Sequence, residues 1–379
     1  MVRGGIFSVK FLSSTYRAEQ SRAKLGSGGG KGRMWKIAFH VLHPGMMMEL
    51  QDLGRSGRRS QGMPAGGAMD AIALQTANLL CGNERGAVAL ELTLSGPQLR
   101  VEAPEGLLAA LCGADMEAAV DGWPLPTWRA VYLPAGSIVA IGRARSGCRA
   151  YLAVAGGVGG LSEPGGVSAG PPAAVARRFA AGDALACGEP SARAAAWTAA
   201  LAQRAAIGAS GGGLCPAAAP WLAPRLMARG AAGPGTVLRA VPGAAYGQLS
   251  EAARMRLWRE RLTASPVSDR MGVRLQPDGP PIMLEHRADI LSHGVLPGAV
   301  QLPPGGAPVV LGAGCQTTGG YPVILHVVSA DMPLLAQVRP GDKVRFASVE
   351  LEEAQQLQLQ QERELNLLDA ALRLKVFPS

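Results

Sequence analysis

The chain has 379 residues, of which 48% are hydrophobic and only 4% are aromatic. This length suffices for two or three domains, and 51 glycines with 28 prolines exclude a mostly helical protein, because these residues interrupt long helices. Residues 1–36 carry eight Lys or Arg and one acid, so +7 of the net charge of +9 lies there and only +2 elsewhere. The folded part is therefore not expected to present a basic face for nucleic acid.

The leader, residues 1–34, ends in the Gly-rich stretch "LGSGGGKGRM" and is expected to be disordered. We interpret it as an extension ahead of a start at Met34, with a transit-like segment as the minority interpretation. No apolar run reaches the roughly 18 residues that a membrane span needs, and no secretory signal is present. The six cysteines show no CxxC and no cluster with histidine, which predicts a reduced, cytoplasmic protein without a zinc site.

Residues 35–188 are expected to form a first β-rich domain. The stretch "WKIAFHVLHPG" (35–45) alternates apolar and polar residues as a strand does. The stretch "AIALQTANLLCGN" (71–83) has helical spacing, with Asp70 at the position of an N-cap. From residue 88 onward, short apolar stretches are separated by Gly and Pro turns, which is typical of a β-barrel or sandwich.

The second half follows a change in composition. Residues 189–235 are rich in Ala, Gly and Pro and are interpreted as a linker with one helical patch. Residues 236–350 return to strands and turns and include a helix capped by Ser250. Residues 351–379 favour a C-terminal helix, whose apolar stripe should pack on the body or on a partner. That stripe consists of Leu357, Leu365, Leu368 and Leu372.

One candidate ligand loop is "CQTTGGYP", and it contains Gln316, Thr317, Thr318, Gly319 and Gly320. Glycines let a backbone approach a ligand closely, and amide and hydroxyl groups can bind a small polar molecule. The same residues also suit an ordinary turn in which the threonine hydroxyls cap their own backbone. Residue types alone favour the turn.

A second candidate is "SDRMG", where Asp269 stands beside Arg270 and Arg274 follows. An arginine fork suits a carboxylate or a phosphate, but a surface ion pair in a turn is an equally good interpretation. By residue type, "QDLGR" (51–55) is a turn and "GAMD" (67–70) is a helix cap.

Three familiar kinds of site are not indicated. The histidines lack metal-ligand spacing, since His40 and His43 lie in a strand-like stretch where they would face opposite sides. No GxSxG nucleophile elbow and no phosphate-binding GxxxxGK[ST] loop occurs. We therefore predict neither a metal centre nor a serine hydrolase nor a P-loop nucleotide site.

Seven stretches together resemble the biotin-dependent carboxyltransferase / allophanate hydrolase subunit 2 family, most strongly the branch that contains the C-type subunits of 5-oxoprolinase. In chain order they are "VLHPGMMMELQDLGRSGRRSQGMPAGGAMD", "ALELTLSGPQL", "RARSGCRAYLAVAGG", "SDRMGVRL", "ILSHGVLPGAVQLPP", "QTTGGYPVI" and "SADMPLLAQVRPGDKVRF". The resemblance covers about residues 36–160 and 236–350. It implies a mainly β protein with a few short helices, built from two cyclophilin-like β-barrel parts.

The resemblance also implies a function in a complex. For this branch the activity is ATP-dependent opening of 5-oxo-L-proline to L-glutamate, with the A-type and B-type proteins of 5-oxoprolinase as partners and ATP used by the complex. One alternative is the carboxyltransferase half of a urea or amide carboxylase that uses carboxybiotin. A non-catalytic alternative is a regulator that binds a B-type partner and relieves its inhibition of a kinase.

The family context raises "QTTGG" from a turn to a ligand loop. Under this resemblance Arg270 and Arg274 would bind the substrate carboxylate, so Arg270→Ala should abolish 5-oxoproline binding. The loop of Gln316, Thr317, Thr318, Gly319 and Gly320 would bind the lactam carbonyl. Asp269 and Asp70 are the candidate catalytic carboxylates, and Arg55 joins Asp70 in a second set.

Three departures from the family pattern concern the same regions. Gly66 stands where the family usually has a serine, and Gly314 stands where it commonly has an acid two positions before Gln316. Residues 159–178 do not reproduce the usual Ser-, Arg- and Thr-containing segment. A hydroxyl and a carboxylate are thus missing, which bears on catalysis more than on binding.

Overall fold

The computed structural model describes residues 36–159, 179–208, 215–225, 235–286 and 290–375. The predicted leader (1–34) and residues 160–178 of the departing segment lie outside the described residues. Within the described ranges, no helix has both the length and the apolar character needed to cross a membrane.

The first half of the chain forms an eleven-stranded antiparallel sheet. Its strands are β1 Lys36–His43, β2 Met48–Gln51, β3 Ala89–Thr93, β4 Gln98–Val101, β5 Leu107–Val120, β6 Trp123–Pro124, β7 Val131–Leu133, β8 Ile138–Val154, β9 Val158–Gly159, β10 Ala184–Cys187 and β11 Ala217–Ala218. The main path runs β11-β7-β5-β8-β4-β1-β10-β9, and β2 pairs with β3, which pairs with β8. The long strands β5 and β8 form its centre.

This sheet is buried on both faces, because successive side chains of a strand point to opposite sides. On β5, Leu107 and Leu111 join one hydrophobic cluster, whereas Leu108 and Cys112 join a second. The second cluster is covered by helix α2 (Ala71–Leu80). β5 is therefore an almost continuous apolar run instead of an alternating one.

The described parts of the Ala-rich segment, residues 189–208 and 215–225, contain one long helix, in keeping with the helical patch that the sequence suggests. Helix α3 (Ala192–Gly208) buries Ala194, Trp197 and Leu201 in the second cluster, and β11 extends the sheet at β7. Alanine is the strongest helix former, so a composition typical of linkers also suits a packed helix. The composition alone does not distinguish a linker from a packed helix. The predicted domain bounds remain a prediction.

The second half closes into a seven-stranded barrel, in the order β12-β19-β16-β17-β14-β13-β20. Its strands are β12 Thr236–Pro242, β13 Leu262–Ala264, β14 Gly272–Pro277, β16 Ala299–Gln301, β17 Val309–Leu311, β19 Val323–Val327 and β20 Lys343–Ser348. A separate pair consists of β15 (His293–Gly294) and β18 (Thr318–Gly319). The remaining short elements are α4 Glu251–Arg259, α5 Met332–Ala336, η1 Arg59–Gln61, η4 Tyr246–Gln248 and η5 Ser329–Asp331. Ser250 caps α4 as predicted.

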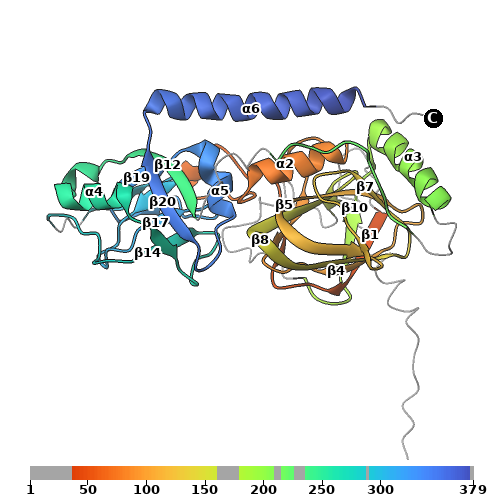
Figure 1. Cartoon of the computed structure of the whole chain (residues 1–379), viewed down its shortest axis with the longest axis horizontal. Helices are drawn as coiled ribbons and strands as arrows, with labels where there is room; N and C mark the ends of the chain where they lie inside the picture. The colour runs from red at the N-terminus through yellow and green to blue at the C-terminus, as the bar shows by residue number, and fades with distance from the viewer. Residues whose placement is uncertain (1–35, 160–178, 209–214, 226–234, 287–289, 376–379) are drawn as a thin grey trace, which may run out of the picture.

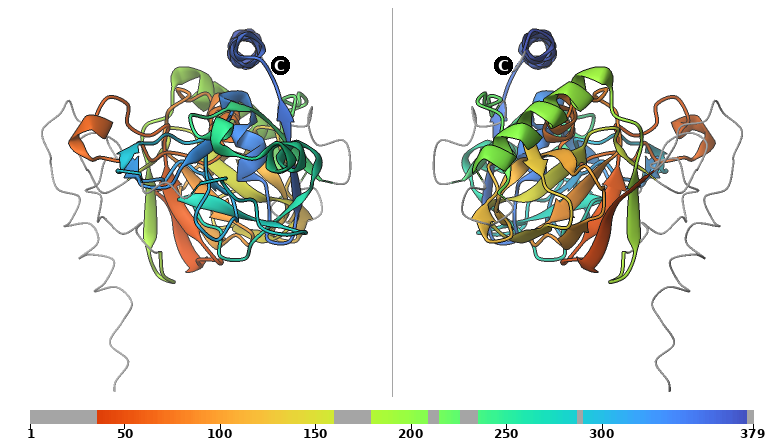
Figure 2. Two further views of the ribbon diagram at one scale, coloured as in Figure 1. Left: turned by 90° about the vertical axis from the view of Figure 1, so that its left-hand side faces the viewer. Right: turned by 90° about the vertical axis from the view of Figure 1, so that its right-hand side faces the viewer.

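The last helix, α6 (Leu351–Arg373), lies across both halves and contacts α2 and η5 (Figures 1 and 2). Leu365 and Leu372 of the predicted stripe are buried, Leu368 packs beside the second cluster, and Leu357 is half-buried. The mainly β class is confirmed, and of the two predicted barrel parts the second is a closed barrel. The helices are short, as predicted, except α3 and α6, which span 17 and 23 residues.

Candidate functional site

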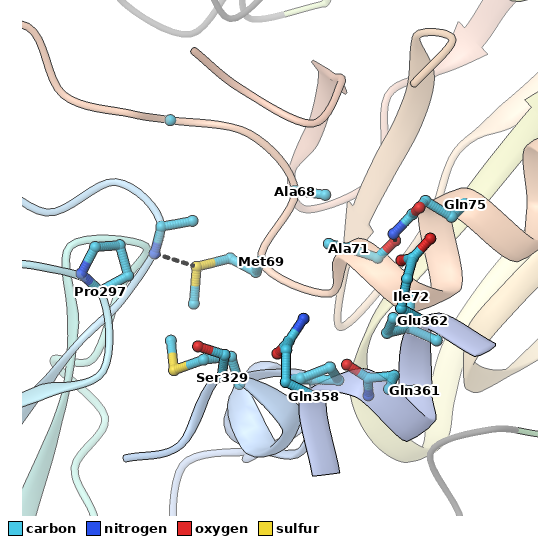
Figure 3. A pocket seen from close by; sticks show the side chains of 14 residues that line it. Ala68, Met69, Ala71, Ile72, Gln75, Pro297, Ser329, Gln358, Gln361 and Glu362 are labelled. Atoms are coloured by element: carbon cyan, nitrogen blue, oxygen red, sulfur yellow. Dashed lines mark hydrogen bonds between the residues drawn. The ribbon is translucent and has the colours of Figure 1, made fainter. Parts of the chain in front are cut away.

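A cavity of about 280 Å³ opens where the two halves of the chain and α6 meet. Its walls come from the loop before α2, from α2, from η5 and α5, and from α6 (Figure 3). Met69 points across it toward the second half, where its Sδ accepts a hydrogen bond from the Ala313 N–H at 3.3 Å. The stretches "GGAMD" and "GAGCQTT" therefore border the same space.

The polar side chains that line this cavity are three amides, one carboxylate and the hydroxyl of Ser329. Gln75 comes from α2, while Gln358, Gln361 and Glu362 come from α6. Glu362 pairs with Arg85 at 2.5 Å, so its charge is compensated. None of the described residues that line the cavity is Lys or Arg. Its lining suits a neutral polar group better than an anion.

Beside the cavity, the side chain of Glu91 is the centre of a buried network. Its Oε2 accepts hydrogen bonds from the Tyr151 hydroxyl at 2.7 Å and from the Met69 N–H at 3.0 Å. Its Oε1 pairs with the guanidinium of Arg270 and, at 3.8 Å, with that of Arg149. Burial acts to raise the pKa of Glu91, but the two arginines and the hydrogen bonds outweigh it and lower the pKa. Glu91 is therefore ionised at neutral pH.

Arg270 joins the two halves of the chain. Its guanidinium contacts Glu91, donates to the backbone oxygen of Gly67 at 2.5 Å and lies 3.6 Å from Glu49 Oε2. Glu49 and Glu91 are directly opposite each other on β2 and β3, so one cation faces two carboxylates. Burial raises the pKa of Glu49, Arg270 opposes this rise, and the charge of Glu91 adds to it.

Asp70 is fully buried at the N-terminus of α2 and is its predicted cap. Its Oδ1 accepts a hydrogen bond from the Ala73 N–H at 2.9 Å, and its Oδ2 accepts one from Gln337 Nε2 at 2.7 Å. Gln337 in turn accepts hydrogen bonds from the N–H groups of Cys148 and Arg149. Burial raises the pKa of Asp70 to about 7 in spite of these hydrogen bonds.

The QTTGG loop, residues 316–320, is held by contacts from both halves of the chain. The Val295 N–H donates to the backbone oxygen of Thr317 at 3.0 Å, next to the pairing of β15 with β18. Arg59 reaches this loop from η1, and its Nη2 donates to the backbone oxygen of Gln316 at 3.0 Å and to that of Val295. The Arg59 side chain thus binds both the QTTGG loop and the segment that pairs with it.

The structure places the predicted residues in different surroundings. Asp70 and Arg270 are brought together in the buried network. Asp269 and Arg274 are exposed on the barrel, and the Asp269 carboxylate accepts from the Met271 N–H at 2.8 Å within its own turn. Arg270 and Arg274 therefore do not form a fork in this structure.

The other predicted residues lie in loops near the cavity. Arg55 is half-buried, with its Nη1 3.9 Å from Met63 Sδ. In the QTTGG loop, Thr318 and Gly320 are exposed, and Gln316 and Thr317 are partly exposed. The loop side chains can therefore be reached from solvent, unlike Asp70.

Sequence reasoning missed most of the residues that surround these groups. They are Glu49, Arg59, Glu91, Arg149, Tyr151, Gln301 and Gln337. One signal was available: the acid in the centre of the apolar strand "ALELT" is buried only if it is paired. The partners could not be inferred from the sequence, because Arg270 follows Glu91 by 179 positions.

The two glycine departures have different structural settings. Gly66 has φ of +64°, a left-handed conformation that costs a serine roughly 1 kcal/mol. A Cβ atom on Gly314 would lie 3.2 Å from the backbone oxygen of Arg270, so a side chain there would be tight. Gly66 is therefore favoured by its backbone, and Gly314 lets the loop approach Arg270. In the described part of the chain, no group of His, Cys, Asp or Glu is arranged to hold a metal ion.

Comparison with known proteins identifies the family of the chain. The family described as the carboxyltransferase domain, subdomains A and B, matches residues 61–348. The C subunit of the Escherichia coli K12 5-oxoprolinase is 35% identical over 333 residues, 85% of this chain and 95% of that protein. A putative urea carboxylase of Emericella nidulans is 40% identical over 127 residues, 33% of this chain and 10% of that protein.

The crystal structure of the Kluyveromyces lactis urea carboxylase has the same fold, with a TM-score of 0.71 at 22% identity. The match covers 92% of this chain but only 30% of the solved chain. The agreement therefore extends over both halves of the present molecule. The chain belongs to the carboxyltransferase domain family of subdomains A and B.

Proposed function

We propose that this chain is the C-type subunit of an ATP-dependent 5-oxoprolinase that opens 5-oxo-L-proline to L-glutamate. The observation that carries the proposal is the 35% identity to the C subunit of a 5-oxoprolinase over 95% of that protein's length. By contrast, the urea carboxylase relative is matched over only 10% of its length. The chain is thus similar to the whole of one separate protein and to a small part of a larger enzyme.

The cavity between the two halves supports a small amide as the ligand. Its amide groups can donate to a lactam carbonyl and accept from a lactam N–H, which a purely apolar pocket cannot do. The partly exposed Gln316 and Thr317 offer an amide and a hydroxyl on the nearby QTTGG loop. We assign substrate binding to this loop, with Thr318, Gly319 and Gly320 completing it.

Asp70 has a pKa of about 7, a value that would suit a general base. Its two oxygens are nevertheless buried against Ala73 and Gln337, where no substrate atom can approach without unwinding the start of α2. We therefore propose that Asp70 and Arg270 hold the two halves of the chain in a fixed relative position. Asp269 and Arg274, exposed on the barrel, remain candidates for contact with a partner protein.

The features of this chain favour ATP binding by a partner protein. Triphosphates are bound by Gly-rich loops that precede helices and by Lys or Arg side chains. The sequence lacks the GxxxxGK[ST] pattern, and among the described residues lining the cavity there is no Lys or Arg. We infer that an A-type or B-type partner protein binds ATP and that this chain completes the substrate site in their complex.

The test is glutamate release from 5-oxo-L-proline with ATP, using this chain co-purified with its A-type and B-type partner proteins. Turnover is expected only when all three proteins are present, and each pairwise mixture serves as a control. A well-formed complex without turnover would contradict the proposal. The next assay would then be carboxyl transfer from carboxybiotin to urea, which the Emericella nidulans relative favours.

A further inference from the structure

Two buried hydrogen-bond donors without an acceptor lie around the QTTGG loop. Gln301 is only 2% exposed, and among the described residues its Nε2 has no hydrogen-bonding partner. The second donor is Nη1 of Arg59, which is also buried without an oxygen acceptor in the described part of the chain. Buried donors in folded proteins are almost always paired, so an unpaired one needs a specific explanation.

The amide of Gln301 lies directly under the loop. Gln301 ends β16, where its backbone is paired with Val309 and Val323 of the barrel. A Cβ atom on Gly319 would lie 2.5 Å from Gln301 Nε2 and 3.4 Å from Gln316 Nε2. The two amide nitrogens therefore flank the place where any other residue at 319 would have its side chain.

A positive charge lies at the start of the same loop, where Arg59 contacts Gln316. Among the described residues, no carboxylate pairs with Arg59, whose Nη2 binds only backbone oxygens. The thiol of Cys315 also lies beside this guanidinium, which opposes the rise of the Cys315 pKa caused by burial. A thiol is a weak acceptor, so it leaves the arginine charge without a matching anion.

We propose that Gln301 and Arg59, with Gln316, bind the oxygen atoms of a small carboxylate beneath the QTTGG loop. The two unpaired donors and the uncompensated cation are the groups that a carboxylate satisfies, because it accepts several hydrogen bonds and carries the opposite charge. The inference deepens the proposed function and rests on it, since it gives the substrate carboxylate a site other than Arg270 and Arg274.

This site requires the loop to move. Gly319 covers Gln301 Nε2 in the present structure, so a ligand oxygen reaches this atom only when residues 318–320 shift. Such a shift is feasible because β18 pairs with only two residues of β15, outside the barrel. Ligand binding and loop movement are therefore coupled at Gln301.

The experiment compares Gln301→Leu with the wild-type full-length chain by thermal unfolding, without ligand and with 5-oxo-L-proline, L-glutamate or 2-pyrrolidinone. Leucine has a similar size and no unpaired donor, so the ligand-free Tm should stay the same or rise by about 2 °C. Binding of a carboxylate should weaken by at least about tenfold in calorimetry. Gln276→Leu, at an exposed glutamine of β14, is the matched control and should leave binding unchanged.

Each outcome decides the inference. A clear fall in the ligand-free Tm of Gln301→Leu would show that the amide already has a structural partner, and would overturn it. The inference is also overturned if neither 5-oxo-L-proline nor L-glutamate binds the wild-type chain. It is overturned as well if 2-pyrrolidinone, which lacks a carboxylate, binds as tightly as 5-oxo-L-proline. Binding of L-glutamate alone, together with a complex that does not turn over 5-oxo-L-proline, would uphold this site while the proposed function fails.

Discussion

The buried network around Glu91 and the QTTGG loop lie close together but differ in how their charges are matched. In the network, Arg270 and Arg149 face Glu91, and Tyr151 donates to the same carboxylate. In the loop, Arg59 faces no described carboxylate and a buried glutamine amide is unpaired. Charges are therefore matched within the chain in the network, although Arg149 Nε and Glu49 Oε2 lack a hydrogen-bonding partner among the described residues. At the loop, the proposed ligand would supply the matching charge.

This contrast separates residues that hold the molecule together from residues that bind. An arginine near a cavity suggests a ligand site, but Arg270 already has its partners within the chain. The sequence does not single out Arg59, because this residue stands in a Gly-rich loop among other arginines. The partner of each arginine, more than its position, distinguishes the two roles.

The largest expected effect is that of Arg270→Ala. The substitution leaves Glu91 buried with only Arg149 to compensate it, so the free energy of unfolding should fall by about 3–5 kcal/mol. Denaturant unfolding measures this loss. Arg274→Ala, four positions along the chain and exposed, is the control and should change stability by no more than about 0.5 kcal/mol.

The same variant tests the fork that the sequence suggested. If Arg270 were a substrate ligand, its loss would abolish 5-oxoproline binding while the chain stayed stable. A stable Arg270→Ala protein that no longer binds 5-oxo-L-proline would thus show that Arg270 is a ligand-binding residue and not a structural one. A destabilised protein that still binds at low temperature would strengthen the contrast between network and loop.

The sequence predicted the elements better than the contacts between them. The helix at 71–83 and its cap Asp70 were visible because apolar spacing and capping are local properties. The partners of Asp70 and Arg270 were not, because Gln337 and Glu91 lie 267 and 179 positions away. Asp269 is exposed and its neighbour Arg270 is mostly covered, so no local pattern could assign them opposite surroundings.

The next effect concerns pH and comes from Asp70. Its pKa is about 7 in the folded chain and about 3.8 when unfolded, so the folded state binds the extra proton between these values. Stability should therefore fall as pH rises from about 4 to 7, by at most about 4 kcal/mol. Asp70→Asn should remove this slope, although it loses one hydrogen bond from Ala73 or Gln337.

Urea unfolding of both proteins at several pH values measures the difference. Comparison with the variant isolates Asp70, since Glu91 has a lowered pKa and acts in the opposite direction at more acidic pH. Equal slopes in the two proteins would mean that Asp70 is ionised throughout. The network would then hold a further buried negative charge, and its charges would not be matched within the chain.

The smallest effect on stability, and the most specific one, is expected at the two loop glycines. A Cβ atom on Gly319 would lie 2.5 Å from Gln301 Nε2, whereas on Gly320 the nearest atom is Ser292 Oγ at 3.5 Å, an ordinary contact. Gly319→Ala should therefore lose about 1 kcal/mol of stability. Gly320→Ala should change it by no more than about 0.5 kcal/mol.

The origin of the difference can be tested with a second substitution. In the Gly319→Ala/Gln301→Ala double variant the methyl group has room, so the two substitutions should interact favourably instead of adding. Ligand binding should nevertheless be at least about tenfold weaker than in the wild-type chain, because the donor under the loop is gone. If the double variant bound the ligand as well as the wild-type chain, the tight contact at Gly319 would serve only to pack the loop, and Gln301 would belong with the structural residues of the Glu91 network.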